Sequence, residues 1–140
     1  MIKKQNMIYI TRKEHFSSAH KLNNPALSEE QNLEIYGKCN NFHGHNYYIE
    51  VTLAGEPDKD SGYVMDLKKL KEIIHKNIID KVDHKYLNDT ELFKNIVPTT
   101  ENMAMVFWDH LIDKVTSENV RLYSIRLYET GKNYVEYRGE

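Results

Sequence analysis

The chain has 140 residues, a length that fits one domain with a core large enough to need no disulfide bonds. Hydrophobic residues make up 40% of the sequence and charged residues 29%, and the formal net charge is −2. Lysine and arginine are spread along the chain, a distribution that disfavours a nucleic-acid-binding surface. No stretch approaches the roughly 20 apolar residues of a membrane-spanning helix. We therefore expect residues 1–140 to form a single domain that binds neither nucleic acid nor membrane.

The only cysteine is Cys39, so the chain cannot form an internal disulfide bond. Residues 1–6 also lack the apolar run of a secretory signal peptide. Both features disfavour a secreted, disulfide-stabilised protein, and we expect a cytoplasmic one.

The first half of the chain predicts two strands separated by a long loop. Apolar residues of one parity predict a strand over residues 8–16. Residues 22–41 are polar and predict a loop with one helical turn near residues 28–33; loops of this length are usually functional. Aromatic and β-branched residues predict the second strand over residues 47–54.

The second half predicts two helices followed by two strands. Apolar residues at helical spacing predict a helix capped by Asp66 and ending near Asp80. A second apolar stripe, after residues 98–100, predicts a helix that continues to Val115. Strands are predicted over residues 122–129 and 134–137.

The resulting order, β-β-α-α-β-β, indicates an α+β fold with both helices on one face of a four-stranded antiparallel sheet. Such a sheet has two open edges, which must be covered or paired, and this favours an oligomer.

Two histidines, His43 and His45, flank Gly44 where the second strand begins. Alternate residues of a strand project to the same face, so both imidazoles can reach one ion. This pattern alone is weak, because two surface histidines at the start of a strand would look the same. His20 adds a third ligand if the first two strands pair antiparallel, since the end of one then lies beside the start of the other.

Three histidine ligands on Zn²⁺ leave its fourth position open, which is the arrangement of catalytic rather than structural zinc sites. Cys39 lies four residues before His43 and could supply a fourth ligand. Its placement therefore decides between an open catalytic site and a closed structural one.

Several motifs along the chain resemble the 6-pyruvoyl-tetrahydropterin synthases and the related 6-carboxytetrahydropterin synthases of queuosine synthesis. The motifs are FSSAH at 16–20, YGKCNN at 36–41, HGHNY at 43–47, VDHKYLN at 82–88, TTEN at 99–102, YET at 128–130 and YRGE at 137–140. Together they cover nearly the whole chain in order, which is far more specific than any one of them.

The resemblance implies a tunnelling-type fold (T-fold) in which three β-β-α-α-β-β units close a barrel and two trimers stack into a homohexamer. It implies 7,8-dihydroneopterin triphosphate as the substrate, bound between subunits. The product is implied to be 6-pyruvoyl-tetrahydropterin, formed with loss of triphosphate. The four-residue spacing between Cys39 and His43 is similar to the queuosine-pathway enzymes, which leave a 6-carboxy group and release acetaldehyde.

The resemblance also implies a role for each candidate residue. His20, His43 and His45 would hold the zinc ion, and Cys39 would be the catalytic base, since a thiolate beside a metal ion is a reactive form of cysteine. The other implied site residues are Asp83 and His84, relaying protons from the neighbouring subunit, and Thr99, Thr100, Glu101 and Glu129, binding the pterin.

Each of these roles has an ordinary structural alternative. Thr99 or Thr100 also fits a helix N-cap, and Glu101 is favourable at the positive end of a helix. Asp83 and His84 could simply end the first helix. A non-catalytic module with a Cys-His₃ structural zinc site is the alternative from a different functional class, and it would lose its fold without metal.

Overall fold

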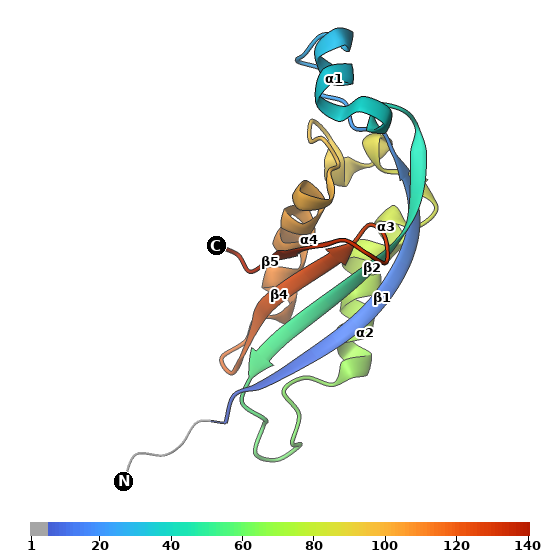
Figure 1. Ribbon diagram of the computed structural model, residues 1–140. Coiled ribbons are helices and arrows are strands. Elements are labelled where there is room, and N and C mark those ends of the chain that lie inside the picture. Colours follow the sequence, from blue (N-terminus) through green and yellow to red (C-terminus); the bar gives the residue numbers. More distant parts are fainter. Residues whose placement is uncertain (1–5) are drawn as a thin grey trace.

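The computed structural model describes residues 6–140, which form one five-stranded sheet with its main helices packed on one face (Figure 1). The strand order is β3-β1-β2-β4-β5. Residues 1–5, on which the expectation of no signal peptide partly rests, lie outside the described residues.

Strands β1 (Ile8–His20) and β2 (His43–Gly55) form the long centre of the sheet. They pair antiparallel along their full 13 residues, from Ile8 opposite Gly55 to His20 opposite His43. Both strands extend beyond the predicted ranges into segments of serine, histidine and glycine. These segments have a low strand propensity. They are extended because each pairs with the other across the β1–β2 ladder.

Strands β4 (Val120–Tyr128) and β5 (Tyr134–Tyr137) continue the sheet on the other side of β2, each antiparallel to its neighbour. The four antiparallel strands confirm the predicted sheet. The structure adds β3 (Lys85–Tyr86), which pairs parallel with Ser18 and Ala19 of β1. Two residues are too few to show an alternating pattern, so β3 left no signal in the sequence.

One helical stretch follows β2, made of α2 (Leu67–Ile74), a π-helical segment η2 (His75–Ile79) and α3 (Asp80–Val82). The predicted cap is present, because Asp66 Oδ1 accepts the N–H of Lys68 at 3.0 Å. Short 3₁₀ segments η3 (Leu87–Asp89) and η4 (Glu91–Phe93) lead to α4 (Thr100–Val115). Among residues 6–140, none of the helices has the length and apolar character needed to cross a membrane.

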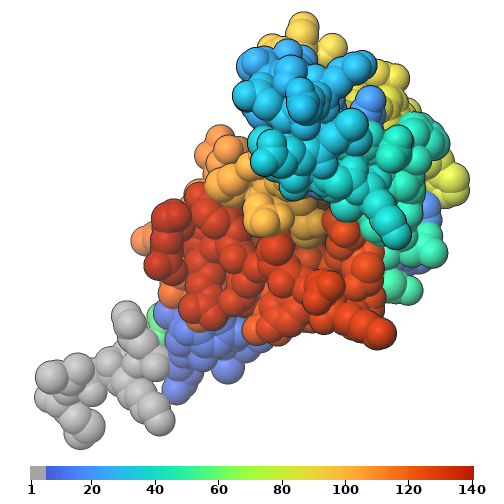
Figure 2. Space-filling model, turned by 45° about the horizontal axis from the view of Figure 1, so that its top comes forward, coloured from blue at the N-terminus to red at the C-terminus, as the bar shows by residue number. Residues whose placement is uncertain are grey.

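The loop between β1 and β2 contains a longer helix than the single turn that the sequence predicted. Helix α1 (Glu29–Tyr36) begins with a capping box, in which Ser28 and Gln31 each accept the other's backbone N–H. A 3₁₀ turn, η1 (Gly37–Cys39), follows it. The buried amide of Asn32 donates to the carbonyls of Asn24 and Ser28, which ties the loop to the helix. Figure 2 shows this segment, in light blue and cyan, covering one end of the molecule.

The core lies between the sheet and the helices α2 and α4. Phe16 of β1 and Tyr47 of β2 stack with ring centroids 4.9 Å apart, and Phe107 of α4 packs edge-on against Phe16 at 5.9 Å. All three side chains are almost completely buried. This packing fixes α4 against the end of the sheet where the histidines lie.

We expect Phe107→Ala to lower the free energy of unfolding by about 3–5 kcal/mol, because it removes a ring from the packed core. Met105 of the same helix is exposed, so Met105→Ala is the matched control and should change stability by less than about 1 kcal/mol. Urea unfolding of both variants measures the difference. Equal losses would show that α4 is not packed as described.

Candidate functional site

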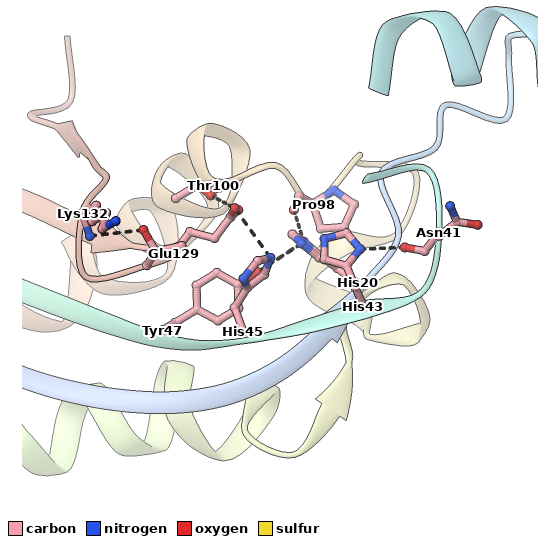
Figure 3. A network of polar contacts seen from close by, with 10 residues as sticks. His20, Asn41, His43, His45, Tyr47, Pro98, Thr100, Glu129 and Lys132 are labelled. Carbon is pink, nitrogen blue, oxygen red and sulfur yellow. Dashed lines mark hydrogen bonds and ion pairs between the residues drawn. The ribbon is translucent and has the colours of Figure 1, made fainter. Parts of the chain in front are cut away.

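The strand register brings His20, His43 and His45 together. His20 lies opposite His43 across the β1–β2 ladder, and His45 is two residues further along β2, on the same face. Each residue offers a ligand nitrogen, and these atoms lie within 4.8 Å of one another. Figure 3 shows the three rings converging on one point. Three imidazole nitrogens so arranged could hold a metal ion.

Backbone carbonyls orient two of the three rings. His20 Nδ1 lies 2.9 Å from the carbonyl oxygen of Pro98, and His43 Nδ1 lies 2.7 Å from that of Asn41 (Figure 3). A carbonyl can only accept, so we assign the proton to Nδ1 in both rings, which makes each Nε2 the atom with the lone pair. The Tyr47 hydroxyl lies 3.4 Å from His20 Nε2, at the long end of hydrogen-bond distance. Metal-binding histidines commonly have such a carbonyl partner, which fixes the tautomer.

The third ring has a buried nitrogen without a hydrogen-bond partner, His45 Nε2. Its nearest charged neighbour is Glu129 Oε1 at 3.6 Å, beyond hydrogen-bond distance. A buried polar atom without a partner is costly unless a ligand satisfies it. Together with the Nε2 lone pairs of His20 and His43, it fits a metal ion at this point.

Burial also sets the charge of the histidines. It lowers the pKa of both His20 and His45, and the nearby His43 lowers them further. Glu129 opposes this shift without cancelling it. Both rings are therefore neutral at neutral pH, which is the form that binds metal. Burial likewise raises the pKa of the Tyr47 phenol, so its hydroxyl, 3.3 Å from His20 Nδ1, stays protonated.

The N-terminus of α4 and the end of β4 meet beside the histidines. Thr100 Oγ1 donates to Glu129 Oε2 at 2.7 Å, and the other oxygen of this carboxylate faces His45 (Figure 3). Thr99 is the N-cap of α4, where its hydroxyl accepts the N–H of Asn102 at 3.1 Å. Glu101 is exposed in the first helical turn. Thr100 and Glu129 thus adjoin the cluster, whereas Thr99 and Glu101 lie at the start of the helix.

Cys39 ends the η1 turn and is half-buried, four residues before His43. Its carbonyl accepts the N–H of Leu22 at 2.9 Å, which pins the two ends of the loop together. Its sulfur is not among the atoms that lie within 4.8 Å of one another in the histidine cluster. Cys39 is therefore close to His43 in the sequence, but its thiol is not part of the histidine cluster.

Asp83 and His84 form a separate pair. Asp83 Oδ1 accepts the backbone N–H of Ser17 at 2.9 Å and lies 3.0 Å from His84 Nδ1. The Ser17 N–H holds the pKa of Asp83 below its ordinary value, with His84 contributing. The His84 side chain is 83% exposed. It lines a hollow of about 470 Å³ to which Ser17, Asn46 and the cluster residue His45 also contribute.

Ser17 and Asn46 lie opposite each other in the ladder, and each is one residue away from a residue of the metal-cluster face. Because successive side chains of a strand alternate, they project from the other face of the sheet. The Asp83–His84 pair is thus not part of the histidine cluster, although His45 of that cluster lines the same hollow as His84. Another hollow, about 780 Å³ and lined by residues such as Lys81 and His110, contains none of the cluster histidines.

Three contributors to the site were not predicted: the hydroxyl of Tyr47 and the carbonyls of Asn41 and Pro98. Tyr47 shares the parity of His43 and His45 on β2, so alternation could have identified it. Backbone carbonyls carry no side-chain signal, and their positions depend on the folded loops.

The family model of 6-pyruvoyl tetrahydropterin synthase matches residues 9–140 of this chain. The chain belongs to the 6-pyruvoyl tetrahydropterin synthase family.

Relatives in this family are similar over most of their length. The human protein named 6-pyruvoyl tetrahydrobiopterin synthase is 45% identical over 134 residues, covering 94% of this chain and 91% of its own. The Drosophila melanogaster protein of that name is 44% identical over 138 residues, covering 96% and 82%. The Bacillus subtilis protein named 6-carboxy-5,6,7,8-tetrahydropterin synthase is 32% identical over 111 residues, covering 75% and 73%.

Solved structures agree with the family assignment. The Caenorhabditis elegans 6-pyruvoyl tetrahydropterin synthase superposes with a TM-score of 0.90 at 39% identity, covering 99% of this chain and 100% of that one. The Plasmodium vivax structure, with a TM-score of 0.70 at 18% identity, shares the fold. The predicted T-fold unit of the family is therefore confirmed.

Replacing His43 by Ala should remove stoichiometric binding of a divalent metal, because two histidines make a much weaker site than three. His110→Ala is the control, since His110 lies in α4 with Nδ1 on the Val106 carbonyl, away from the cluster. Metal content after dialysis, measured by atomic emission, tests this. Retained metal in the His43 variant would contradict the site.

Between about pH 8 and about pH 6, metal affinity should fall with falling pH less steeply than protonation of three ordinary histidines would cause. The reason is that His20 and His45, whose pKa values are lowered, take up protons less readily than ordinary histidines do. Competition with a chromophoric chelator across this range measures the dependence. A loss of affinity as steep as three ordinary histidines would give would contradict the lowered pKa values.

Proposed function

We propose that this chain is a zinc-dependent lyase that converts 7,8-dihydroneopterin triphosphate into 6-pyruvoyl-tetrahydropterin with loss of triphosphate. The observation that carries the proposal is the convergence of three imidazole nitrogens, with no fourth side-chain ligand of the cluster among residues 6–140. The names of the relatives at 44–47% identity supply the pterin chemistry. The functional unit in this proposal is the whole chain, residues 1–140, as one cytoplasmic domain.

Zinc is the metal that an all-histidine site of this kind suits, with the fourth position left for substrate. When bound, it would polarise the hydroxyl groups of the substrate side chain and make the adjacent protons easier to remove. His20, His43 and His45 would hold it, and the carbonyls of Pro98 and Asn41 keep two of the rings aimed.

Cys39 is the proposed base that takes the side-chain proton. Its sulfur stands outside the histidine cluster, which supports a role beside the metal rather than on it. Glu129 is the proposed anchor of the pterin ring, because a carboxylate can accept two parallel hydrogen bonds from a guanidine-like edge. Thr100 holds one Glu129 oxygen through its hydroxyl, and Thr99 and Glu101 complete the proposed pocket.

Asp83 and His84 are the proposed proton relay, acting on the site of a neighbouring subunit. Neither residue belongs to the histidine cluster of their own chain, which supports this division. The open edges of the sheet support assembly. Among residues 6–140, β1 is paired on its outer side only at Ser18 and Ala19, and β5 ends the sheet. We propose the homohexamer of two stacked trimers, with sites between subunits.

Replacing Cys39 by Ala should abolish turnover of 7,8-dihydroneopterin triphosphate while zinc remains bound at one ion per chain. The reason is that the thiol is needed for proton transfer and not for holding the metal. Chromatography of the product tests the loss of turnover, and atomic emission tests whether zinc is retained. Loss of zinc together with loss of fold would instead support the structural Cys-His₃ module.

A second candidate product is the 6-carboxy compound, favoured by the short spacing between Cys39 and His43 and by the 32% identical Bacillus subtilis relative. The wild-type protein should release triphosphate without acetaldehyde. An enzymatic acetaldehyde assay on the same reaction decides: stoichiometric release would replace the pyruvoyl product by the carboxy product and leave the zinc site unaffected.

A further inference from the structure

The two serines of the FSSAH motif, Ser17 and Ser18, have no part in the chemistry proposed so far. In the structure they are joined to the segment that carries Asp83 and His84, by four backbone and side-chain links. Ser18 Oγ donates to the Val82 carbonyl at 2.6 Å, and the Ser17 N–H donates to Asp83 Oδ1 at 2.9 Å. The His84 N–H donates to the Ser17 carbonyl at 2.7 Å, and β3 pairs with Ser18 directly afterwards.

His84 needs such support, because its backbone has a φ of 60°. A residue with a side chain rarely adopts this left-handed conformation, and it persists where the surroundings hold it. The turn follows the last residue of α3, Val82, whose carbonyl belongs to a helix end and has no partner within the helix. Ser18 supplies that partner.

Among the hydrogen bonds that hold this turn, the one from the Ser18 hydroxyl is buried. Ser18 is only 5% exposed, and its side chain lies on the same face of β1 as His20. Without the Ser18 hydroxyl, the buried Val82 carbonyl would lose its hydrogen-bond donor. The turn formed by residues 82–84 would then lose the hydrogen bond that holds its first residue, Val82.

The turn at residues 82–84 determines which nitrogen of the His84 ring faces Asp83. Asp83 Oδ1, held by the Ser17 N–H, faces His84 Nδ1 at 3.0 Å. In the neutral ring, a carboxylate at this distance favours the tautomer with the proton on Nδ1, so that Nε2 carries the lone pair of this exposed side chain. The direction of that lone pair thus depends on the backbone between Val82 and His84.

We propose that Ser18 is a positioning residue for the Asp83–His84 pair, acting through its hydrogen bond to the Val82 carbonyl. This rests on the proposed function, which gives the pair its role as a proton relay. Strand β1 would then serve both halves of the chemistry: His20 for the metal of its own chain, and Ser18 for the relay offered to a neighbour.

The test compares Ser18→Ala with Thr116→Ala in the zinc-loaded, full-length protein. Thr116 is the matched control, because its hydroxyl also donates to a backbone carbonyl at a helix end, that of Ile112 at 2.6 Å, far from the pair in the chain. Ser18→Thr keeps the hydroxyl and serves as the rescue variant.

Nitrogen NMR of the histidine side chains gives the first readout. We expect His84 in the wild-type and Thr116→Ala proteins to show one tautomer, with the proton on Nδ1, and Ser18→Ala to show a mixture. The signals of His20 and His43 should be unchanged, which separates a local effect from a general loss of structure. An unchanged His84 tautomer in Ser18→Ala would overturn the proposal.

Steady-state kinetics with the pterin triphosphate give the second readout. Ser18→Ala should lower kcat about ten-fold or more with KM changed less than about two-fold, because misplacing a catalytic group mainly affects the chemical step. Thr116→Ala should match the wild type, and Ser18→Thr should recover most of kcat. In a His84→Ala background, adding Ser18→Ala should cause no further loss.

An equal loss from Ser18→Ala with and without His84 would show that Ser18 acts elsewhere, and would contradict the positioning role. Wild-type turnover in His84→Ala alone would instead remove the relay from the proposed function. In that case the NMR readout still decides whether Ser18 holds the pair.

Discussion

The antiparallel pairing of β1 with β2 is the constraint on which the site depends. Its 13-residue register ends with His20 directly opposite His43. A slip of one residue would turn every side chain of one strand to the other face. His20 would then leave the cluster, and Phe16 would leave its stack on Tyr47. The core and the metal cluster are therefore fixed by the same ladder, and a sequence that packs this core also assembles the three histidines.

The same ladder sorts the side chains of β1 by face. Ser18 and His20 lie on the face that packs against the helices, where burial keeps the His20 imidazole neutral. Ser17 projects from the other face, and its backbone N–H and carbonyl bind the Asp83–His84 turn. In the proposed function, the metal site and the proton relay therefore depend on the same strand, and assembly of several copies would bring the relay of one chain to the metal site of another.

Much of the fold could be predicted from the sequence because it rests on periodicity. The ranges of β5 and α4, and the cap at Asp66, follow from patterns that local residues determine. The fifth strand, β3, could not be predicted, since its two residues depend on the neighbouring β1. In the site, the sequence motifs predicted the histidine side chains. They could not predict the carbonyls of Pro98 and Asn41, because only the folded loops bring these carbonyls to the histidines.

The central claim is that three histidines bind one zinc ion and leave its fourth position open beside Cys39. X-ray absorption at the zinc edge tests it most directly, since zinc–nitrogen and zinc–sulfur distances differ, at about 2.0–2.1 Å and about 2.3 Å. The zinc-loaded protein should show three nitrogen ligands and one oxygen ligand, with no sulfur. A sulfur ligand at about 2.3 Å that disappears in Cys39→Ala would contradict the open site and make the zinc structural.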